Sequence, residues 1–373
     1  MIFSSLISYS QDSSSLKTKK TIWDIPHKSV WEKWMWIHRA VTFEVTKDRP
    51  VNYDTNYIKS YQKKLVITVP VSYKQLQFSL IDFKSGNKLT FAPNQQYDFG
   101  ISISSRWASF IINTGAKLFN KDTHIKGETN YQDYQVNLYN RKITTDMFFQ
   151  NYSGFYIKNS KTFASYANTQ PYDIRTDVKA VNMGASTYYI VNHKKFTFKN
   201  SFTFVEKQKK SAGSILIGTY YSYFDAKGNP SLVTYPFKSN FDSLSFIRNG
   251  HSHNFGFNLG YIYTFVFLKK FYATASLVQG IGGTQIVYVL EDNTKYNKLS
   301  GGAGKLNVRL ALGYDKGKYF IGTMSMFDYY LFRGNENSTL DYNFGKFMIY
   351  VGYRFSTIKA EKKILKHFKL INY

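Results

Sequence analysis

The sequence predicts an all-β protein, an antiparallel transmembrane β-barrel of about twelve strands, or fourteen if one early pair belongs to the wall. Long stretches alternate large apolar residues with smaller or polar ones, which is the period of a β-strand. Aromatic residues make up 18% of the 373-residue chain, including 32 Tyr and 32 Phe, as the aromatic girdles of a barrel require. No stretch approaches the roughly 18 apolar residues of a transmembrane helix.

The clearest alternating stretch is 255–267. Its odd positions are all large and apolar or aromatic, from Phe255 to Phe267, and its even positions run Gly, Asn, Gly, Ile, Thr, Val. A strand that crosses lipid needs such a one-sided wall over roughly 9–11 residues. The pattern therefore predicts that the odd face meets lipid. It also predicts that lysine in place of Phe257 or Phe265 costs more than lysine in place of Asn258, which would face the lumen.

The net charge and the cysteine content limit which partners and which chemistry the chain can be expected to have. The net charge is +25 and there are no cysteines, so disulfides, thiolate nucleophiles and Cys-based zinc sites are excluded. The lysines are spread through the turns. This suits the phosphates of outer-membrane lipid or lipopolysaccharide, the expected partners beside other envelope proteins. Without a clustered basic face or a known motif, nucleic acid is not expected as a partner.

The chain divides into four expected segments. Residues 1–11 are expected to be the remnant of a signal peptide, because the apolar run is short and lacks a basic n-region; an ordinary disordered start is the alternative. Residues 12–60 should form a periplasmic segment. It includes a short amphipathic helix with four tryptophans, Trp23, Trp31, Trp34 and Trp36. The barrel is expected at 61–355. Residues 356–373 should form a basic periplasmic tail, against the membrane or frayed in solvent.

Twelve strands are expected from Tyr97 onward. They start near 97, 107, 133, 142, 174, 195, 213, 252, 269, 306, 317 and 346. The stretches 65–73 and 76–80 are expected to be a hairpin beside or beneath the barrel, since Pro70 favours an edge or bent strand. Long loops are expected at 226–250, 283–303 and 332–341. The connections 193–195 and 206–212 are both short, which breaks the alternation of short turns and long loops, so one strand is miscounted or one outer loop is tight.

Several motifs together resemble one family. They are Leu65–Val71 with Tyr57–Ile58 upstream, Phe91–Asn94 leading into Gly100, Tyr139–Lys142, Gln150 with Gly154–Tyr156, Gln208–Ser214, Gly260–Phe265 and Gly352–Phe355. This set, over roughly 55–357, resembles the family called domain of unknown function 4421, outer-membrane β-barrel proteins of Bacteroidota. The resemblance implies a barrel in a Gram-negative outer membrane. It implies no activity and no catalytic residues.

Six charges face inward in this alternation and are expected to form a lumen network: Asp133, Asp146, Lys199, Arg309, Asp328 and Arg354. Buried charges need partners; a selective lumen is the functional alternative. His251 and His253 share one strand face but lack a third ligand nearby, so no metal and no cofactor are expected. The chain has no Gly-x-Ser-x-Gly, and it is not expected to be an enzyme.

A barrel of this size has a largely filled or narrow interior, whereas 16–18 strands leave an aqueous channel. The sequence therefore favours a structural or interaction platform in the outer membrane. The alternatives are a narrow channel or transporter for solute or lipid, and an outer-membrane lipid-modifying enzyme.

Overall fold

The computed structural model describes residues 52–62, 64–94, 97–105, 108–115, 122–167, 170–331 and 337–356. All of them belong to one compact unit, Asn52–Ile364. Its elements are β1 (Ile58–Ser60), β2 (Lys64–Asp82), β3 (Lys88–Ala92), β4 (Tyr97–Ser105), β5 (Ala108–Gly115), α2 (Thr123–Lys126), β6 (Asn130–Tyr139), β7 (Ile143–Ile157), η3 (Ser160–Thr162), β8 (Asp173–Ile190), α3 (Lys199–Phe202), β9 (Glu206–Gln208), β10 (Ala212–Lys227), η4 (Lys238–Asn240), η5 (Ser243–Ser245), β11 (Ile247–Phe267), β12 (Phe271–Leu290), β13 (Lys295–Asp315), β14 (Tyr319–Leu331) and β15 (Ser338–Ser356).

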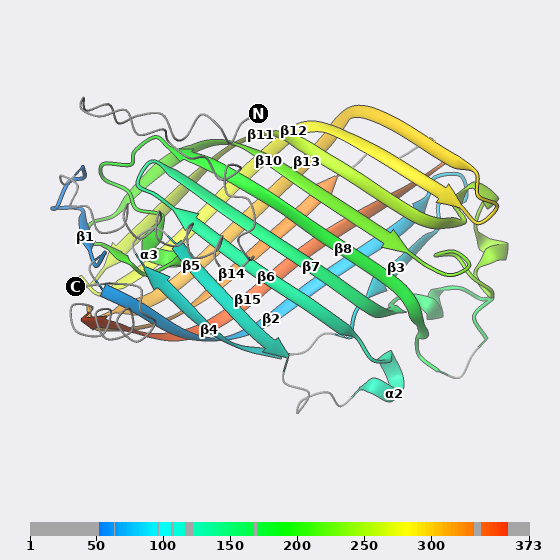
Figure 1. Ribbon diagram of the computed structural model, residues 1–373, viewed down its shortest axis with the longest axis horizontal. Coiled ribbons are helices and arrows are strands. Elements are labelled where there is room, and N and C mark those ends of the chain that lie inside the picture. The colour runs from blue at the N-terminus through cyan, green and yellow to red at the C-terminus, as the bar shows by residue number, and fades with distance from the viewer. Residues whose placement is uncertain are drawn as a thin grey trace, which may run out of the picture. The chain divides into compact units, whose positions relative to one another are not determined.

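Thirteen strands form one sheet that closes on itself (Figure 1). From β2 the order of paired neighbours is β15, β14, β13, β12, β11, β10, β8 and β7. The closing pair β15–β2 is antiparallel from Ser338↔Asp82 to Ser356↔Lys64. The end where β2 begins and β15 finishes, on the left of Figure 1, is termed the turn end, and the opposite end the loop end. This architecture confirms the predicted barrel.

Between β7 and β2 the wall takes two routes. Toward the loop end β3 alone bridges the gap, pairing Phe91 with Phe78 of β2 and Ala92 with Tyr156 of β7. Toward the turn end β4, β5 and β6 fill it, because β4 pairs with the first half of β2 and β6 pairs with β7. The barrel is therefore ten strands round at the loop end and twelve at the turn end. Both numbers are even, so all neighbouring strands stay antiparallel.

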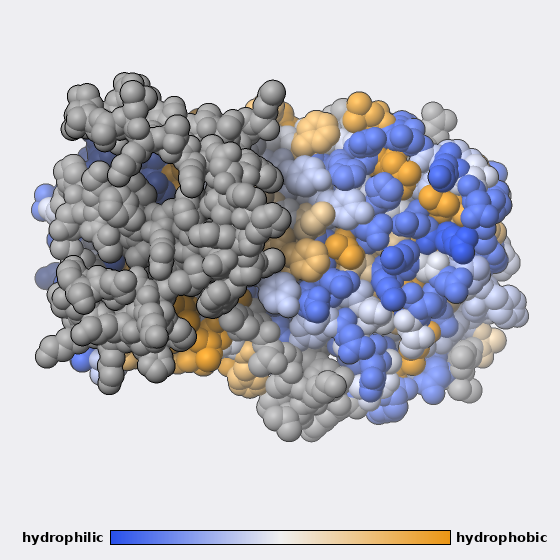
Figure 2. All heavy atoms as spheres, in the orientation of Figure 1, coloured by the Kyte–Doolittle hydropathy of each residue, from blue (hydrophilic) through white to orange (hydrophobic). Residues whose placement is uncertain are grey.

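The outer face carries an apolar belt. In β11 the side chains of Phe257 and Phe265 are 73% and 53% exposed, while Asn258 is buried inside. This confirms the predicted orientation of 255–267. The same outward apolar positions recur in β4 (Ile101, Ile103), β10 (Ile215, Ile217), β13 (Leu310, Leu312) and β15 (Ile349, Val351). Such a continuous apolar surface suits lipid and not water. On the face that Figure 2 shows, hydrophilic residues predominate at the loop end.

The apolar belt stops at one level of the wall. On the outer face of β2 the apolar residues end at Tyr73, and from Leu76 the large apolar residues point inward. In β15 Phe344 points inward, and the apolar residues of the outer face begin at Phe347. Tyr73 pairs with Phe347 and Leu76 pairs with Phe344, so both strands switch at the same height. Beyond it β2 continues to Asp82, roughly 15–20 Å along the axis for strands tilted by about 40°. The wall thus projects past its apolar belt at the loop end.

The interior is filled in three layers. At the loop end stacked rings fill the narrow half: Phe78 and Phe91 have centroids 4.7 Å apart, and Phe224 and Tyr342 are 4.4 Å apart. A belt of buried charged and polar side chains follows in the middle. At the turn end a second aromatic layer comes from the connection between β8 and β10.

That connection corrects one prediction, because residues 195–206 are not a strand of the wall. They turn inward around the short helix α3, and Phe196, Phe198, Phe202 and Phe204 are all buried. The spacing of four between Phe198 and Phe202 fits a helical turn. We refer to residues 193–209 as the plug. With one connection here instead of two, successive connections lie alternately at the turn end and at the loop end.

Two further expectations are wrong. Residues 65–80 are one strand of the wall, β2, and not a hairpin beside it. Pro70 fits because the β2–β4 pairing skips it, running from Thr68↔Ser102 to Val71↔Phe99, so no N–H is needed there. Residues 283–303 are not a long loop either, since β12 and β13 run through most of this stretch and meet in a tight turn at 291–294.

Some expectations lie outside the described residues. They are the signal remnant at 1–11, the tryptophan-rich helix in 12–60 and the tail after Ser356. Within the described part of the chain, no helix has the length and apolar character needed to cross a membrane.

Candidate functional site: the filled lumen and its two closures

The first charged cluster of the middle layer is centred on Lys74. Its ammonium lies 2.8 Å from a carboxylate oxygen of Asp133 and 3.3 Å from one of Asp98. Lys346 is the cross-strand partner of Lys74 and donates to Gln135 Oε1 at 2.7 Å. The two lysines and two aspartates are all buried. Because unpaired buried charges are very costly, each of these charges requires the others.

The second cluster is centred on Arg309. Its Nη2 lies 2.8 Å from Asp146 Oδ2, and its Nε donates to Asn307 Oδ1 at 3.0 Å. Asn307 donates in turn to Asp328 at 2.9 Å, and the Lys305 ammonium lies 3.2 Å from the same carboxylate. Two cations again balance two anions. The middle layer therefore presents no net charge that would attract ions of one sign.

A small cavity lies between the two clusters. It measures about 40 Å³ and is lined by side chains of both, among them Gln135, Asp146, Lys305, Arg309 and Lys346. A space of this size holds about two or three water molecules. It is far below the 300–1,000 Å³ or so of a small-molecule pocket.

Arg354 and Asp315 fix the turn end. The guanidinium donates to both Asp315 oxygens at 2.9 and 2.8 Å, and to the carbonyls of Phe204 and Gly317 at 2.8 Å each. The Phe204 ring lies 4.6 Å from the Tyr350 ring. Arg354 thus binds the last strand, the β13–β14 turn and the plug together.

Glu206 fixes the other side of the plug. It is fully buried and pairs with Arg141, with Lys199 at 3.7 Å, and accepts from Gln62 at 3.0 Å. Burial alone would raise the pKa of Glu206, but the Lys199 and Arg141 cations and its hydrogen bonds hold that pKa below its ordinary value. The carboxylate therefore stays charged and keeps the plug tied to the β6–β7 turn.

A cap closes the loop end. Residues 228–246 lie over the aromatic layer with Leu232, Val233 and Phe237 fully buried. Arg175 of the wall donates to the carbonyls of Leu232 and Ser231, both at 2.7 Å.

Two ion pairs hold the rim of this cap. Asp242 accepts from Lys84 of the β2–β3 turn at 2.5 Å, and Glu291 of the β12–β13 turn accepts from Lys238 at 2.7 Å. Hydrogen bonds from these lysines lower the pKa of Asp242 and of Glu291. Both carboxylates are therefore charged at neutral pH.

The six residues predicted to form a lumen network all lie inside the barrel, but in three places. Asp133 belongs to the first cluster; Asp146, Arg309 and Asp328 belong to the second; Lys199 and Arg354 belong to the turn-end closure. Sequence reasoning missed their partners Lys74, Asp98, Lys305, Asp315, Lys346 and Glu206. The signal for several of them was a charge at an inward position of a strand.

The two histidines predicted to share a face do so, on the outside of β11. Tyr221 Oη and His253 Nδ1 lie 2.8 Å apart, and the His251 ring lies 5.9 Å from that of His253. Among the residues that the structure describes, no three His, Cys, Asp or Glu side chains gather as a metal site would require.

A closed antiparallel barrel with an apolar outer belt and a filled lumen defines a β-barrel of the outer-membrane type. Residues 52–355 match the family described as "Domain of unknown function (DUF4421)", and the chain belongs to that family. This confirms the resemblance seen in the motifs. No curated protein sequence matches the chain.

Solved structures of outer-membrane proteins are similar at low identity. The outer membrane protease OmpT from Escherichia coli is 8% identical, with 80% of this chain and 98% of that chain covered and a TM-score of 0.37. The translocator domain of the autotransporter NalP from Neisseria meningitidis is 12% identical, with 87% and 96% covered and a TM-score of 0.31. The Pseudomonas putida toluene transporter TodX is 7% identical, with 79% and 89% covered and a TM-score of 0.29.

Proposed function

We propose that the protein is a closed outer-membrane barrel of a Gram-negative bacterium, which acts as a structural or interaction platform and not as an open channel. The observation that carries this proposal is the filling of the lumen at both ends. The plug occupies the turn end, the cap occupies the loop end, and a cavity of about 40 Å³ separates the two charged clusters between them.

The orientation belongs to the same proposal. Barrels of this kind keep short turns in the periplasm and longer loops outside. The turn end, where the wall begins and finishes, would face the periplasm. The loop end, with its projecting wall and the cap, would face outward and offer the surface for partners.

Charge balance supports a structural lumen over a selective one. Ion-selective pores carry rings of one charge sign along a water-filled path. Here Lys74 pairs with two aspartates beside Lys346, which donates to Gln135, and Arg309 and Lys305 pair with two more. The arrangement holds the wall together and leaves no excess charge for selection.

Conductance in planar bilayers tests the proposal. We expect the folded barrel to be heat-modifiable, which means that it migrates differently on a gel before and after boiling, because a closed barrel resists detergent until it is boiled. The protein that passes this check should give no discrete current steps, while an open porin in the same bilayers does. A second preparation should carry glycine-serine linkers of equal length in place of the plug and the cap. It should also give no steps, because the stacked rings and the paired charges of the wall strands still fill the interior. Reproducible steps from the unaltered protein would instead establish the narrow channel or transporter.

We also propose that the chain has no enzymatic activity. The histidines nearest each other in sequence, His251 and His253, lie on the outer wall against Tyr221 and Tyr223, away from the enclosed charges of the lumen. Lipid analysis of a deletion strain tests this part. A missing lipid modification that the cloned gene restores would establish the lipid-modifying enzyme.

A further inference from the structure

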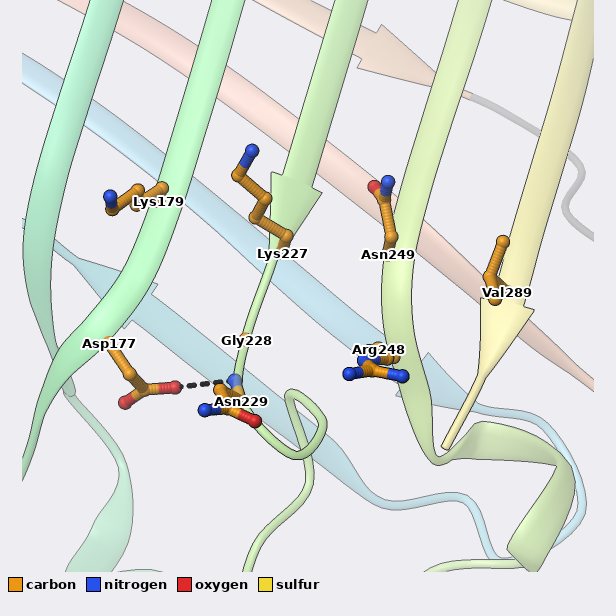
Figure 3. Close-up of a pocket in the computed structure, with 8 residues that line it drawn as sticks. All are labelled: Asp177, Lys179, Lys227, Gly228, Asn229, Arg248, Asn249 and Val289. Atoms are coloured by element: carbon orange, nitrogen blue, oxygen red, sulfur yellow. Dashed lines mark hydrogen bonds between the residues drawn. The ribbon is translucent and has the colours of Figure 1, made fainter. Parts of the chain in front are cut away.

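A notch opens in the outer wall at the loop end. Strand β10 ends at Lys227, where it pairs with Lys179 of β8 on one side and Asn249 of β11 on the other. Both neighbours extend further toward the loop end, to Asp173 and Ile247. The space between them, beyond the end of β10, measures about 400 Å³ (Figure 3).

The floor of the notch is fixed by hydrogen bonds. The N–H of Gly228 donates to the Arg248 carbonyl at 3.0 Å, and the N–H of Asn229 donates to Asp177 Oδ2 at 2.8 Å, the dashed line in Figure 3. Arg175 binds both Asp177 oxygens, at 2.9 and 2.7 Å. A Cβ on Gly228 would lie 3.0 Å from Arg175 Nη2, so a side chain does not fit there. The floor is a defined surface.

Three cations border this floor. Lys179 and Lys227 lie directly opposite each other on neighbouring strands and point along the outer wall, and Arg248 lies on the far side of the turn (Figure 3). Like charges opposite each other destabilise a sheet. The structure shows no ion pair of either ammonium with any residue that it describes, and the nearby Asp177 is already neutralised by Arg175. Asp225, two residues below Lys227 on the same face, attracts Lys227 without contacting it, and Arg248 donates to Asn293 Oδ1 at 3.1 Å. A bound anion would remove this repulsion.

Below the notch on the same outer face lies Asp225, opposite His251. An apolar surface follows toward the turn end, with Tyr223 beside His253, Tyr221 beside Phe255, and then Phe257 within the lipid belt. The cations at the level of Asn249 lie six residues from Phe255, roughly 15 Å above it for a strand tilted by about 40°. The face therefore suits an amphiphile with a tall anionic head. A phospholipid phosphate would lie lower, near the edge of the apolar belt.

We propose that the notch binds a phosphate on the saccharide headgroup of lipopolysaccharide, with Lys179, Lys227 and Arg248 as the ligands. Charge-assisted hydrogen bonds from lysine and arginine are the usual means of holding phosphate. The acyl chains of the same molecule pack on the apolar face below. The inference rests on the proposed outer-membrane location with the loop end outward, and it names the lipid partner and its site.

The test compares affinities of the refolded full chain in non-ionic detergent for fluorescent deep-rough lipopolysaccharide. The K179Q/K227Q/R248Q variant should bind at least tenfold more weakly than the unaltered protein. A matched control, K269Q/K270Q/K316Q, removes three exposed lysines from turns at the turn end and should change the affinity less than twofold. Dephosphorylated lipopolysaccharide should bind the unaltered protein as weakly as intact lipopolysaccharide binds the notch variant.

Three results would overturn the proposal. They are equal affinity of the notch variant and the unaltered protein, equal affinity for phosphorylated and dephosphorylated lipopolysaccharide, and full competition by inorganic phosphate or phosphatidylglycerol vesicles. Heat-modifiability of each variant shows that its barrel is intact. A failure here leaves the conductance result untouched, so the notch and the closed lumen are judged separately.

Discussion

Replacing Arg354 by alanine should destabilise the barrel more than any single exposed substitution. The side chain is buried, makes two charged hydrogen bonds to Asp315, and donates to the carbonyls of Phe204 and Gly317. Its guanidinium carbon also lies 4.2 Å from the centre of the Tyr61 ring. One substitution thus removes contacts to three segments of the turn end.

The expected loss of stability follows from the charge that Arg354→Ala leaves behind in the interior. In Arg354→Ala the buried Asp315 carboxylate loses the guanidinium that neutralises it. Breaking a buried pair by removing one partner costs about 3–5 kcal/mol. Replacing both partners, as in Arg354→Met with Asp315→Asn, removes the uncompensated charge and should cost about 2 kcal/mol less than Arg354→Ala alone.

Urea unfolding in phospholipid vesicles, followed by the gel shift between folded and unfolded chain, measures these differences. Lys318→Ala is the control, because Lys318 is exposed at the same turn and its loss should change the stability little. The reasoning is refuted if Arg354→Ala falls within 1 kcal/mol of the control. It is also refuted if the double variant is as unstable as the sum of the single ones.

Three further outcomes are expected. Phe257→Lys should lower the free energy of unfolding by about 2–4 kcal/mol in the same assay. Val289→Lys, on the outer face at the level of the notch, should lower it by about 0–1 kcal/mol. If the two losses were equal, the apolar belt would have been assigned to the wrong level of the wall. Because the pKa of Asp242 is lowered in the folded cap, its charged carboxylate stabilises the cap at pH values above the ordinary Asp pKa of about 3.9. This stabilisation is lost as the pH falls through the lower pKa of the folded state. Protection of 228–246 against hydrogen exchange, relative to the intrinsic rate at each pH, should therefore fall between pH 6 and pH 3. Asp242→Asn lacks the Lys84 ion pair at both pH values and should make this fall smaller, and the Lys238–Glu291 pair accounts for what remains. Truncation after Ser356 should leave the barrel heat-modifiable, whereas truncation before Tyr353 should abolish assembly, because it removes Arg354 and part of the closing strand.

Strand positions in the lipid belt could be predicted because lipid imposes a strict rule on them. Every second residue must be apolar over the whole crossing, and Phe257 and Leu259 obey it without exception. The inward positions of Arg309 and Asp328 followed from the same alternation. Asp146, the partner of Arg309, comes from a strand far away in sequence, so that pairing had no local signal. Lys305, the partner of Asp328, lies on the neighbouring strand β13.

The apolar pattern misled where the wall leaves the belt. In β2 the large residues change from odd to even positions between Tyr73 and Leu76, which suggested two strands. The structure shows one strand with two environments. Its half near the turn end faces lipid on the outside, and its half near the loop end faces a packed aromatic interior. A change of phase in hydrophobic alternation is what a single straight strand must show when its apolar surroundings move from one face to the other.

The alternating pattern also failed to predict which lumen positions tolerate a larger side chain, because that depends on how tightly the lumen is packed. The sequence identified Asn258 as lumen-facing and therefore tolerant of lysine. The lumen is packed there: a Cβ added to Gly280 would lie 2.7 Å from Asn258 Oδ1. Asn258→Lys should thus be costly too, through overpacking and a buried charge. The plug shows the same limit, because the phenylalanines of 195–206 satisfy a strand pattern while filling the barrel they were expected to build.

The change from ten to twelve strands accounts for where the charges lie. Asp98 and Asp133 come from β4 and β6, which exist only in the wider half, and they meet Lys74 and Lys346 at the level where the outer apolar belt stops. Aromatic rings from opposite walls can meet across ten strands, as Phe224 and Tyr342 do. A barrel's diameter grows with its strand number, so the wider half needs longer side chains and an inserted segment to fill it. Strands β4, β5 and β6 therefore create the space for the plug. Two of them also supply the aspartates that neutralise the lysines where the wider half meets the narrower one.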